Sequence, residues 1–172
     1  MAQELKFPVA ELLKKPQGTR EEYEINLKPN FGEDITFKSN LKAKVILMAL
    51  KDEIHVELRD LETEIERHCD KCLKKYGEKV HIPLVEGEYL TEPPKYTEKD
   101  EDFFLIDKKD LNIDITDLLR QEILLHFPLI SVCSKSCKGL CPKCGTDLNK
   151  RKCDCKTSDD GKKPLAVLKY FK

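Results

Sequence analysis

Residues 41–58 read LKAKVILMALKDEIHVEL, and this stretch predicts two neighbouring β-strands. Apolar and charged side chains alternate in part over 41–50 and again over 53–58, which is typical of strands that bury one face. The polar pair Lys51-Asp52 separates the two runs and indicates an antiparallel meander. The same partial alternation recurs in three further segments, at 23–27, 61–68 and 78–90.

Short helices are predicted at three places. The first covers 9–14. The second covers about 115–125, follows Asp114 as a favourable N-cap, carries a wide apolar stripe and ends before Pro128. The third covers 164–171 and begins with a proline. The predicted fold class is α+β: an antiparallel β-rich domain, either a meander or a partial barrel, with a few short helices and a cysteine-rich tail.

These elements divide the chain into three regions. Residues 1–90 form the β-rich domain. Residues 91–132 contain an acidic linker and a helix that packs on the sheet, because 91–102 holds two prolines and seven charged side chains. Residues 133–172 form a zinc-binding tail that ends in the last short helix.

The composition favours a cytoplasmic globular protein. The chain has 172 residues, of which 40% are hydrophobic, so it can bury a core of ordinary size. No apolar run approaches the roughly 20 residues of a membrane span, and the N-terminus lacks the pattern of a secretory signal. We expect no membrane partner. Because disulfides are rare in a reducing cytosol, the eight cysteines are expected to be metal ligands or redox groups.

Charge is distributed unevenly along the chain. Residues 133–172 contain eleven Lys/Arg and four Asp, a formal charge of +7. The other 132 residues carry 20 basic and 28 acidic side chains, a formal charge of −8. A basic tail on an acidic body indicates an anionic partner for the tail, or self-association. Thiolates bound to a metal would offset part of the tail's charge.

The most specific local motif is Cys141-Pro-Lys-Cys144-Gly145. An i,i+3 cysteine pair in a tight turn directs two thiolates at one metal ion. Pro142 presets φ for such a turn, and Gly145 permits the positive φ with which the chain leaves it. The motif therefore predicts half of a tetrahedral zinc site.

The remaining cysteines can complete one or two zinc sites. Cys69 and Cys72 offer a second half-site, although Gly77 lies too far along the chain to act as its exit glycine. Because a single residue separates the last two cysteines, an alternative grouping exchanges the pair 153/155 with the pair 133/137. The grouping we expect places Cys141, Cys144, Cys153 and Cys155 around one ion and Cys69, Cys72, Cys133 and Cys137 around the other.

Other chemistry fits the sequence less well. Four thiolates also suit iron, so an iron-thiolate electron carrier remains an alternative. Neither CxxC pair has the βαβ setting of a thioredoxin-like catalyst. The four histidines lie in strand or helix-end patterns, and no nucleophile, base and orienting group come together. We expect no enzymatic activity and no small-molecule substrate.

Basic side chains surround the ligands of the tail. A small zinc module with exposed Lys and Arg can bind phosphates, which supplies affinity without reading the base sequence. The run from Asn149 to Lys152 is the densest, and a solvated loop is its alternative interpretation. The candidate RNA-binding residues are Lys138, Lys143, Lys150, Arg151, Lys152 and Lys156.

Several motifs of this chain occur together in one known family. They are RHCDKCLKKY at 67–76, DLLRQEILLHFP at 117–128, C-x3-CKGLCPKCGTDLN-x3-CDC at 133–155, and PLAVLKYF at 164–171. From about residue 40 to the end, the chain resembles the YceD family, whose members are called large ribosomal RNA subunit accumulation proteins. The resemblance implies a bacterial, cytoplasmic, non-enzymatic factor in ribosome assembly that acts near a large-subunit ribosomal protein.

The sequence thus leads to one main hypothesis. We expect a zinc-stabilised, β-rich factor that binds ribosomal RNA or a large-subunit precursor. In the alternative, the acidic body is an adaptor for a basic ribosomal protein and never touches RNA.

Overall fold

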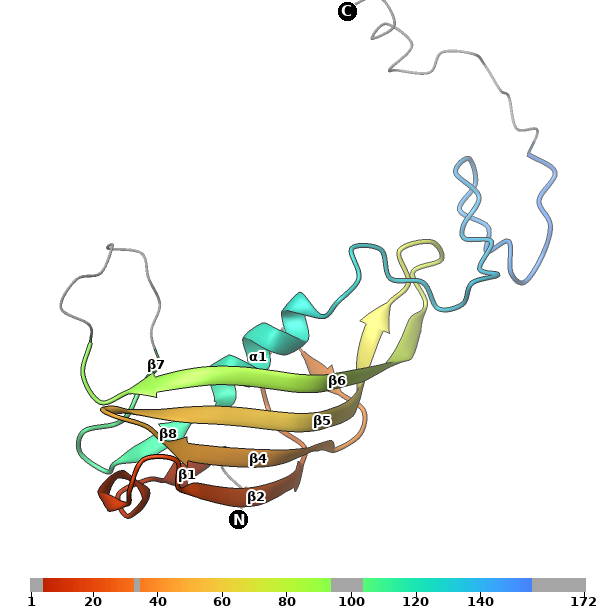
Figure 1. Cartoon of the computed structure of the whole chain (residues 1–172). Coiled ribbons are helices and arrows are strands. Elements are labelled where there is room, and N and C mark those ends of the chain that lie inside the picture. The colour runs from red at the N-terminus through yellow and green to blue at the C-terminus, as the bar shows by residue number, and fades with distance from the viewer. Residues whose placement is uncertain (1–4, 33–34, 94–103, 156–172) are drawn as a thin grey trace, which may run out of the picture.

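The computed structural model describes residues 5–32, 35–93 and 104–155, and a six-stranded sheet forms its main layer (Figure 1). The strand order is β2-β4-β5-β6-β7, with β3 paired to the far end of β5. All neighbouring strands are antiparallel except β6 and β7. The expected antiparallel, strand-rich architecture is therefore confirmed. The strands are β2 (Arg20–Leu27), β3 (Thr36–Phe37), β4 (Leu41–Ala49), β5 (Glu53–His68), β6 (Lys75–Leu90) and β7 (Phe104–Leu105).

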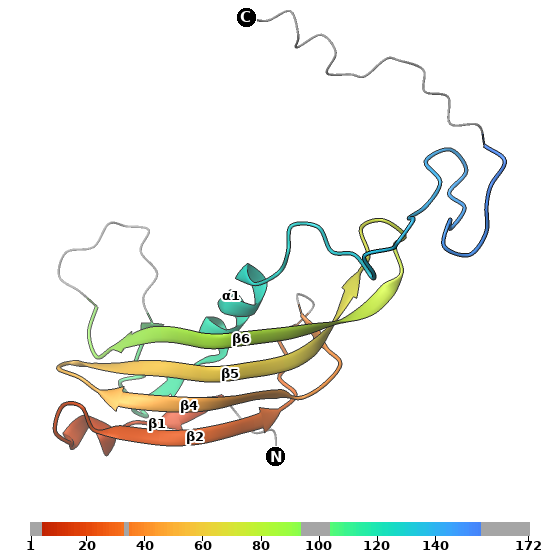
Figure 2. The same ribbon diagram turned by 45° about the vertical axis from the view of Figure 1, so that its right-hand side comes forward.

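A second layer covers one face of this sheet. It consists of the antiparallel pair β1 (Lys6–Pro8) and β8 (Asn112–Asp114), together with helix α1 (Thr116–Leu125). Figures 1 and 2 show α1 alongside β6 from two directions. A Cβ on Gly87 would lie 2.8 Å from Leu118 Cδ2, so the helix contacts β6 directly. The apolar side chains of both layers form the core, and its fully buried members include Leu41, Leu47, Ile54, Leu58, Leu61, Ile113, Ile115, Leu119 and Ile123.

The segments 53–58 and 61–68, predicted as two strands, form the single sixteen-residue strand β5. A β-bulge joins them, because Asp60 has a φ of +52° and the register against β4 shifts at this point. The bulge changes which residues face the core, from even-numbered to odd-numbered positions. The β6 residue at this level is Pro83, which has no N–H to donate. The buried residues on either side are Ile54, Val56 and Leu58, then Leu61, Thr63 and Ile65.

The predicted helices were placed with mixed accuracy. The first is only a turn of 3-10 helix over Leu12–Lys14. The second is α1, which begins at Thr116 and whose first N–H donates to Asp114 Oδ1 at 3.0 Å. The third, at 164–171, lies outside the described residues. Within the described residues, no helix is long and apolar enough to cross a membrane.

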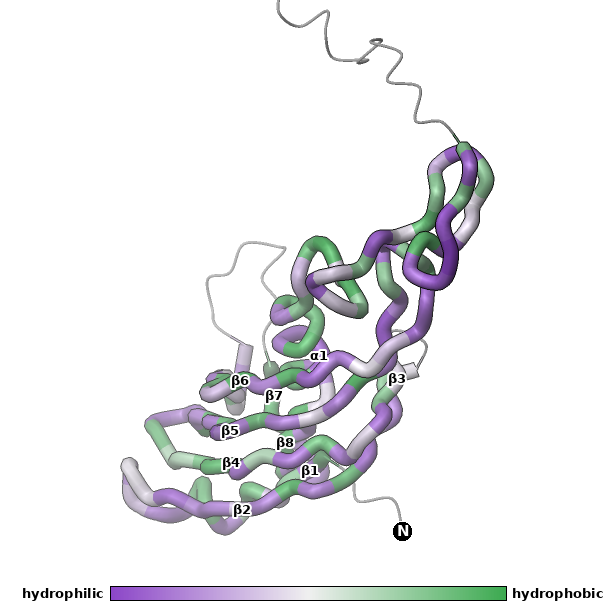
Figure 3. Tube along the Cα trace, turned by 90° about the vertical axis from the view of Figure 1, so that its right-hand side faces the viewer, coloured by the Kyte–Doolittle hydropathy of each residue, from purple (hydrophilic) through white to green (hydrophobic). Residues whose placement is uncertain are grey.

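The β5–β6 hairpin extends beyond the body and carries the tail at its tip (Figures 1 and 2). Figure 3 shows hydrophilic and hydrophobic positions alternating along the strands, as expected for a sheet with one buried face. The tail over 131–155 contains loops and one β-bridge, between Leu140 and Asp147. With so little regular structure, this segment depends on other contacts for its shape.

Candidate metal centres

The first candidate centre starts at the turn between β5 and β6. Cys69 and Cys72 lie in this turn, which we call the first knuckle (residues 69–74). The Leu73 N–H donates to Cys69 O at 2.8 Å, and the Cys69 N–H donates to Lys74 O at 2.9 Å. These two bonds close the turn tightly, so both sulfurs lie on one side of it.

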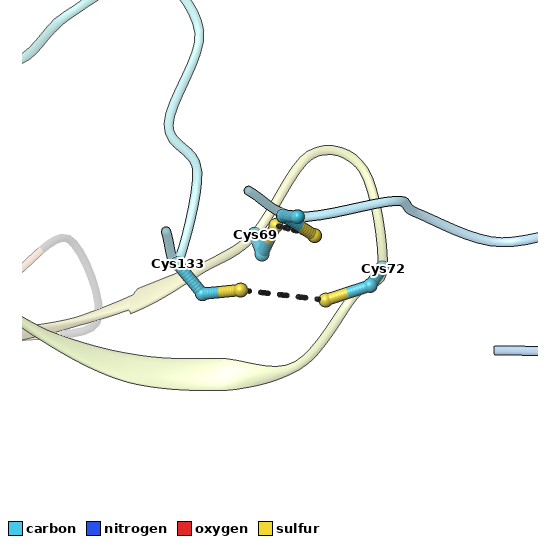
Figure 4. Close-up of side chains that lie close together, drawn as sticks. Cys69, Cys72 and Cys133 are labelled. Carbon is cyan, nitrogen blue, oxygen red and sulfur yellow. Dashed lines mark hydrogen bonds between the residues drawn. The ribbon is translucent and has the colours of Figure 1, made fainter. Parts of the chain in front are cut away.

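Two cysteines of the tail complete this group. Cys137 Sγ lies 3.8 Å from Cys69 Sγ, and Cys133 Sγ lies 3.7 Å from Cys72 Sγ (Figure 4). All four sulfurs lie within 4.8 Å of one another. A tetrahedral zinc ion with Zn–S bonds of about 2.3 Å separates its sulfurs by about 3.8 Å. A disulfide needs about 2.05 Å, so the geometry fits a shared metal ion.

Backbone contacts hold the tail against the first knuckle. Asp70 N–H donates to Ser131 O at 2.8 Å, and Ser131 N–H donates to Asp70 Oδ2 at 2.6 Å. Leu140 N–H donates to Lys71 O at 2.9 Å. Gly139 has a φ of +75°, and a Cβ there would lie 2.9 Å from Lys71 O. Only glycine allows this close approach.

Arg67 at the end of β5 holds the segment that follows α1. Its guanidinium carbon lies 4.2 Å from the centre of the Phe127 ring, a cation–π contact. Its Nη2 donates to Ser131 Oγ at 2.7 Å, and its Nε lies 3.7 Å from Glu78 Oε2. The hairpin therefore positions the chain just before Cys133, and the first centre depends on the body for its shape.

The second candidate centre lies wholly within the tail. The sulfurs of Cys141, Cys144, Cys153 and Cys155 lie within 4.8 Å of one another. Gly145 N–H donates to Cys141 O at 2.9 Å, and Cys141 N–H donates to Thr146 O at 2.8 Å. These bonds repeat those of the first knuckle position by position, so residues 141–146 form a second knuckle with the same backbone.

The two knuckles differ in the residue at the exit of the turn. In the second knuckle this residue is Gly145, with a φ of +70°. In the first it is Leu73, with a φ of +59° and an exposed fraction of 66%. A leucine in this left-handed region carries a strain of about 1–2 kcal/mol that glycine avoids. The exit residue of the first knuckle is thus a leucine, a residue type for which a positive φ is unfavourable.

The thiols of each group have divergent pKa values. Burial raises the pKa of Cys69, but the N–H groups of Cys133, Cys72 and Lys71 outweigh this effect and lower the pKa to about 6. Desolvation and neighbouring thiols raise the pKa of Cys133 to about 12. In the second group, the Thr146 hydroxyl and N–H lower the pKa of Cys144 to about 6.

The fourth thiol of the second group shows the opposite effect, because Cys144 beside it raises the pKa of Cys155 to about 12. Four thiols so close together cannot all carry charge unless a cation joins them. A divalent ion would supply that charge, and both groups offer it four sulfur ligands. Every cysteine of the two groups is a free thiol.

The sulfurs fall into the two groups that we expected, and the exchange of 133/137 with 153/155 does not occur. Binding of zinc itself stays a prediction. Asn149 was missed as a neighbour of the first group: its Nδ2 lies 3.5 Å from Cys137 Sγ, and its Oδ1 accepts the Lys138 N–H at 2.8 Å. No periodic pattern marks such a residue, because it acts through a loop contact.

The comparison with known proteins assigns a family. Residues 59–172 match the family described as "Large ribosomal RNA subunit accumulation protein YceD". The chain belongs to the YceD family. The match includes both cysteine groups and begins at residue 59, somewhat later than the resemblance indicated. No solved structure matches this YceD-family chain.

Two curated plant proteins are similar to part of this YceD-family chain. Both are named "Large ribosomal RNA subunit accumulation protein YCED homolog 1, chloroplastic". The Arabidopsis thaliana protein is 44% identical over 59 residues, which cover 33% of this chain and 18% of the relative. The Zea mays protein is 43% identical over 58 residues, which cover 33% of this chain and 20% of the relative. The matched segments therefore span about a fifth of these relatives.

The basic side chains predicted to bind RNA are exposed in this YceD-family structure, apart from Lys156, which lies outside the described residues. Two further exposed lysines, Lys71 and Lys74, lie on the first knuckle. Hydrogen bonds from Asn149 lower the pKa of Asp147, and Lys150 and Lys74 lower it further. The first knuckle contacts the tail through Lys71, whose carbonyl accepts the Leu140 N–H at 2.9 Å. In the part of the tail that the structure describes, the exposed basic residues are Lys135, Lys138, Lys143, Lys150, Arg151 and Lys152.

The histidines of this YceD-family chain do not enter the two groups. His68 is exposed at the end of β5, although it precedes a ligand in sequence. His55 lies near Glu57 and Glu86 on the outer face of the sheet, with Nε2–Oε1 distances of 3.7 and 3.4 Å. Glu57 already binds Arg59 at 2.6 Å, so its charge is balanced without a metal.

Proposed function

We propose that this YceD-family protein is a non-enzymatic, cytoplasmic factor that supports large-subunit ribosomal RNA accumulation by binding rRNA or a pre-ribosomal particle. Its two cysteine groups bind zinc, and the zinc ions hold the basic side chains of the tail in place. One observation carries the proposal: exposed lysines and an arginine surround two sets of four converging sulfurs, in a chain of a family described by ribosomal RNA accumulation.

Zinc is proposed as the metal for a structural role. Four thiolates close a tetrahedral site and leave no position for water or substrate, which is typical of structural zinc. The described part of the tail has one β-bridge and no helix or strand, so its shape depends on such links. Iron bound by the same thiolates would make the protein coloured and an electron carrier instead.

The RNA-binding surface is the basic face around the second knuckle. Lys150, Arg151 and Lys152 are consecutive and exposed on the loop between Cys144 and Cys153. Phosphate contacts of this kind supply affinity that does not depend on base sequence and that falls as salt rises. The alternative, an adaptor that uses the acidic body to bind a basic ribosomal protein, predicts no RNA contact at this loop.

Removal of the three charges tests the RNA proposal. We expect the variant Lys150→Ala/Arg151→Ala/Lys152→Ala to bind rRNA fragments more weakly than wild type. The slope of log K against log salt should become shallower by about 2, because each lost phosphate contact contributes about 0.7 for single strands. Fluorescence anisotropy over a salt series measures both quantities.

A matched control removes three exposed lysines of the body, Lys28, Lys51 and Lys79. The control has the same change in net charge and should retain wild-type affinity and slope. Equal losses in both variants would show a general charge effect and contradict the proposed surface. Crosslinking in cells adds a second readout, since protein-only crosslinks from the 150–152 loop would favour the adaptor.

A further inference from the structure

Within the described part of the chain, nothing in the structure favours a leucine at the exit of the first knuckle. The two knuckles have equivalent backbone bonds, with Leu73 N–H to Cys69 O at 2.8 Å and Gly145 N–H to Cys141 O at 2.9 Å. Both exit residues have a positive φ, +59° and +70°. The backbone that glycine serves in one knuckle is therefore the backbone that a leucine adopts in the other.

Among the residues that the structure describes, the Leu73 side chain gains little from packing. It is 66% exposed, and the partly buried apolar residues around the first centre are Tyr76, Val132 and Leu140 instead. A left-handed conformation disfavours any branched side chain at this position. Residues whose backbone is strained, and whose side chain adds no stabilising contact to the fold, are characteristic of functional sites. Because none of the described residues accounts for this side chain, its contact is sought in a partner.

The surroundings of Leu73 are cationic. Lys71 and Lys74 flank it in the turn, and both are exposed. The first knuckle lies against the tail, since the Leu140 N–H donates to Lys71 O at 2.9 Å. The apolar side chain therefore projects from a surface whose charges belong to two knuckles. Such a surface fits a partner that offers negative charge and an apolar face together.

We propose that the RNA-binding surface around the second knuckle extends onto the first, where Leu73 packs on an unpaired base while Lys71 and Lys74 bind the phosphates on either side. The inference rests on the proposed function, because it presumes that RNA is the partner. Unpaired bases of RNA loops and ends can expose their faces to a side chain, whereas bases in a paired A-form helix are stacked and inaccessible. Leu73 thus confers a preference for unpaired RNA that phosphate contacts alone cannot give.

Two substitutions at Leu73 distinguish the loss of side-chain contact from the release of backbone strain. Leu73→Ala keeps a side chain in the strained conformation, and Leu73→Gly removes the strain as well. Both should weaken binding to an oligouridine single strand about tenfold, the loss expected for one buried leucine. Both should bind a perfectly paired RNA duplex of the same length as wild type does. The salt slope should stay unchanged, since no charge is removed.

Stability and metal content are measured on the same variants. Leu73→Gly should retain its metal and unfold at a midpoint no lower than wild type, so a folding defect cannot explain the loss. Leu84→Ala is the matched control, because Leu84 is a 46% exposed leucine on β6 outside the knuckles. It should bind both probes as wild type does.

The outcomes distinguish this inference from the proposed function. If the Leu73 variants bind the single strand like wild type while the Lys150/Arg151/Lys152 variant is weakened, the role of Leu73 is wrong and RNA binding stands. If wild type binds neither probe, both proposals are wrong. If the Leu73 variants lose only a ribosomal-protein partner, the side chain contacts protein and the inference is overturned.

Discussion

At the scale of single residues, backbone conformation decides which positions of the tail tolerate a side chain. Gly139 and Gly145 both have a positive φ, +75° and +70°. They differ in their surroundings: a Cβ on Gly139 would meet Lys71 O at 2.9 Å, whereas a Cβ on Gly145 would meet nothing within 4 Å. Gly139 is therefore needed both for its positive φ and for the close approach of Lys71 O, whereas Gly145 is needed for its positive φ alone.

This difference predicts unequal effects of the same substitution. Gly145→Ala should reduce zinc affinity about fivefold to tenfold, which corresponds to the strain of about 1 kcal/mol for a left-handed alanine. Gly139→Ala should cost more than about 2 kcal/mol, because the tail must also move away from the first knuckle. Competition with a chromophoric zinc chelator measures both affinities. Equal losses would contradict the close contact of Gly139 with Lys71.

At the scale of elements, the long strands could be predicted from the sequence, but the short ones could not. Alternation over 41–50 and 78–90 predicts β4 and β6 because each strand is long enough to show its period. The bulge at Asp60 interrupts the alternation, so β5 was divided into two strands. Strands β1, β3, β7 and β8 have only two or three residues, too few for any periodicity.

The packing of α1 on β6 predicts how these two elements depend on each other. Gly87→Ala should destabilise the protein by about 1–3 kcal/mol, because its Cβ would overlap the buried Leu118 side chain at 2.8 Å. Adding Leu118→Ala should cost less in the Gly87→Ala background than in wild type, since the overlap is then relieved. Chemical denaturation of all four proteins gives the coupling energy. Additive changes in the free energy of unfolding would mean that residue 87 and the Leu118 side chain are not in contact.

At the scale of the whole molecule, the body and the tail have different sources of stability. The body has a core that runs from Leu5 to Ile123, whereas the apolar cluster at the first centre contains the buried residues Cys69, Cys72 and Cys137. The CxxC spacing predicted the two half-sites, because a metal-binding turn is a local pattern, but it left open which pairs complete them. The contacts that hold the tail to the hairpin, such as Asp70 with Ser131, join distant segments and carry no such pattern.

Metal removal should therefore affect the two parts unequally. Metal analysis of protein purified without chelators should give two zinc ions per chain, one for each sulfur group. After chelation, we expect proteases to cleave within 133–155 while the β-sheet signal in circular dichroism persists. The unfolding midpoint should fall by about 10 °C for a loss of about 4 kcal/mol. Less than one metal per chain, or visible iron absorption, would contradict zinc in these sites.

The wide sequence separation within the first sulfur group has a consequence for the denatured protein. Cys72 and Cys133 are 61 positions apart, and the segment between them includes β6 and α1. A link across such a span restricts the conformations open to the unfolded chain, as a disulfide does. An ion that stays bound to the unfolded chain would thus raise the stability of the sheet and helix without touching either, by lowering the entropy of the state into which they unfold.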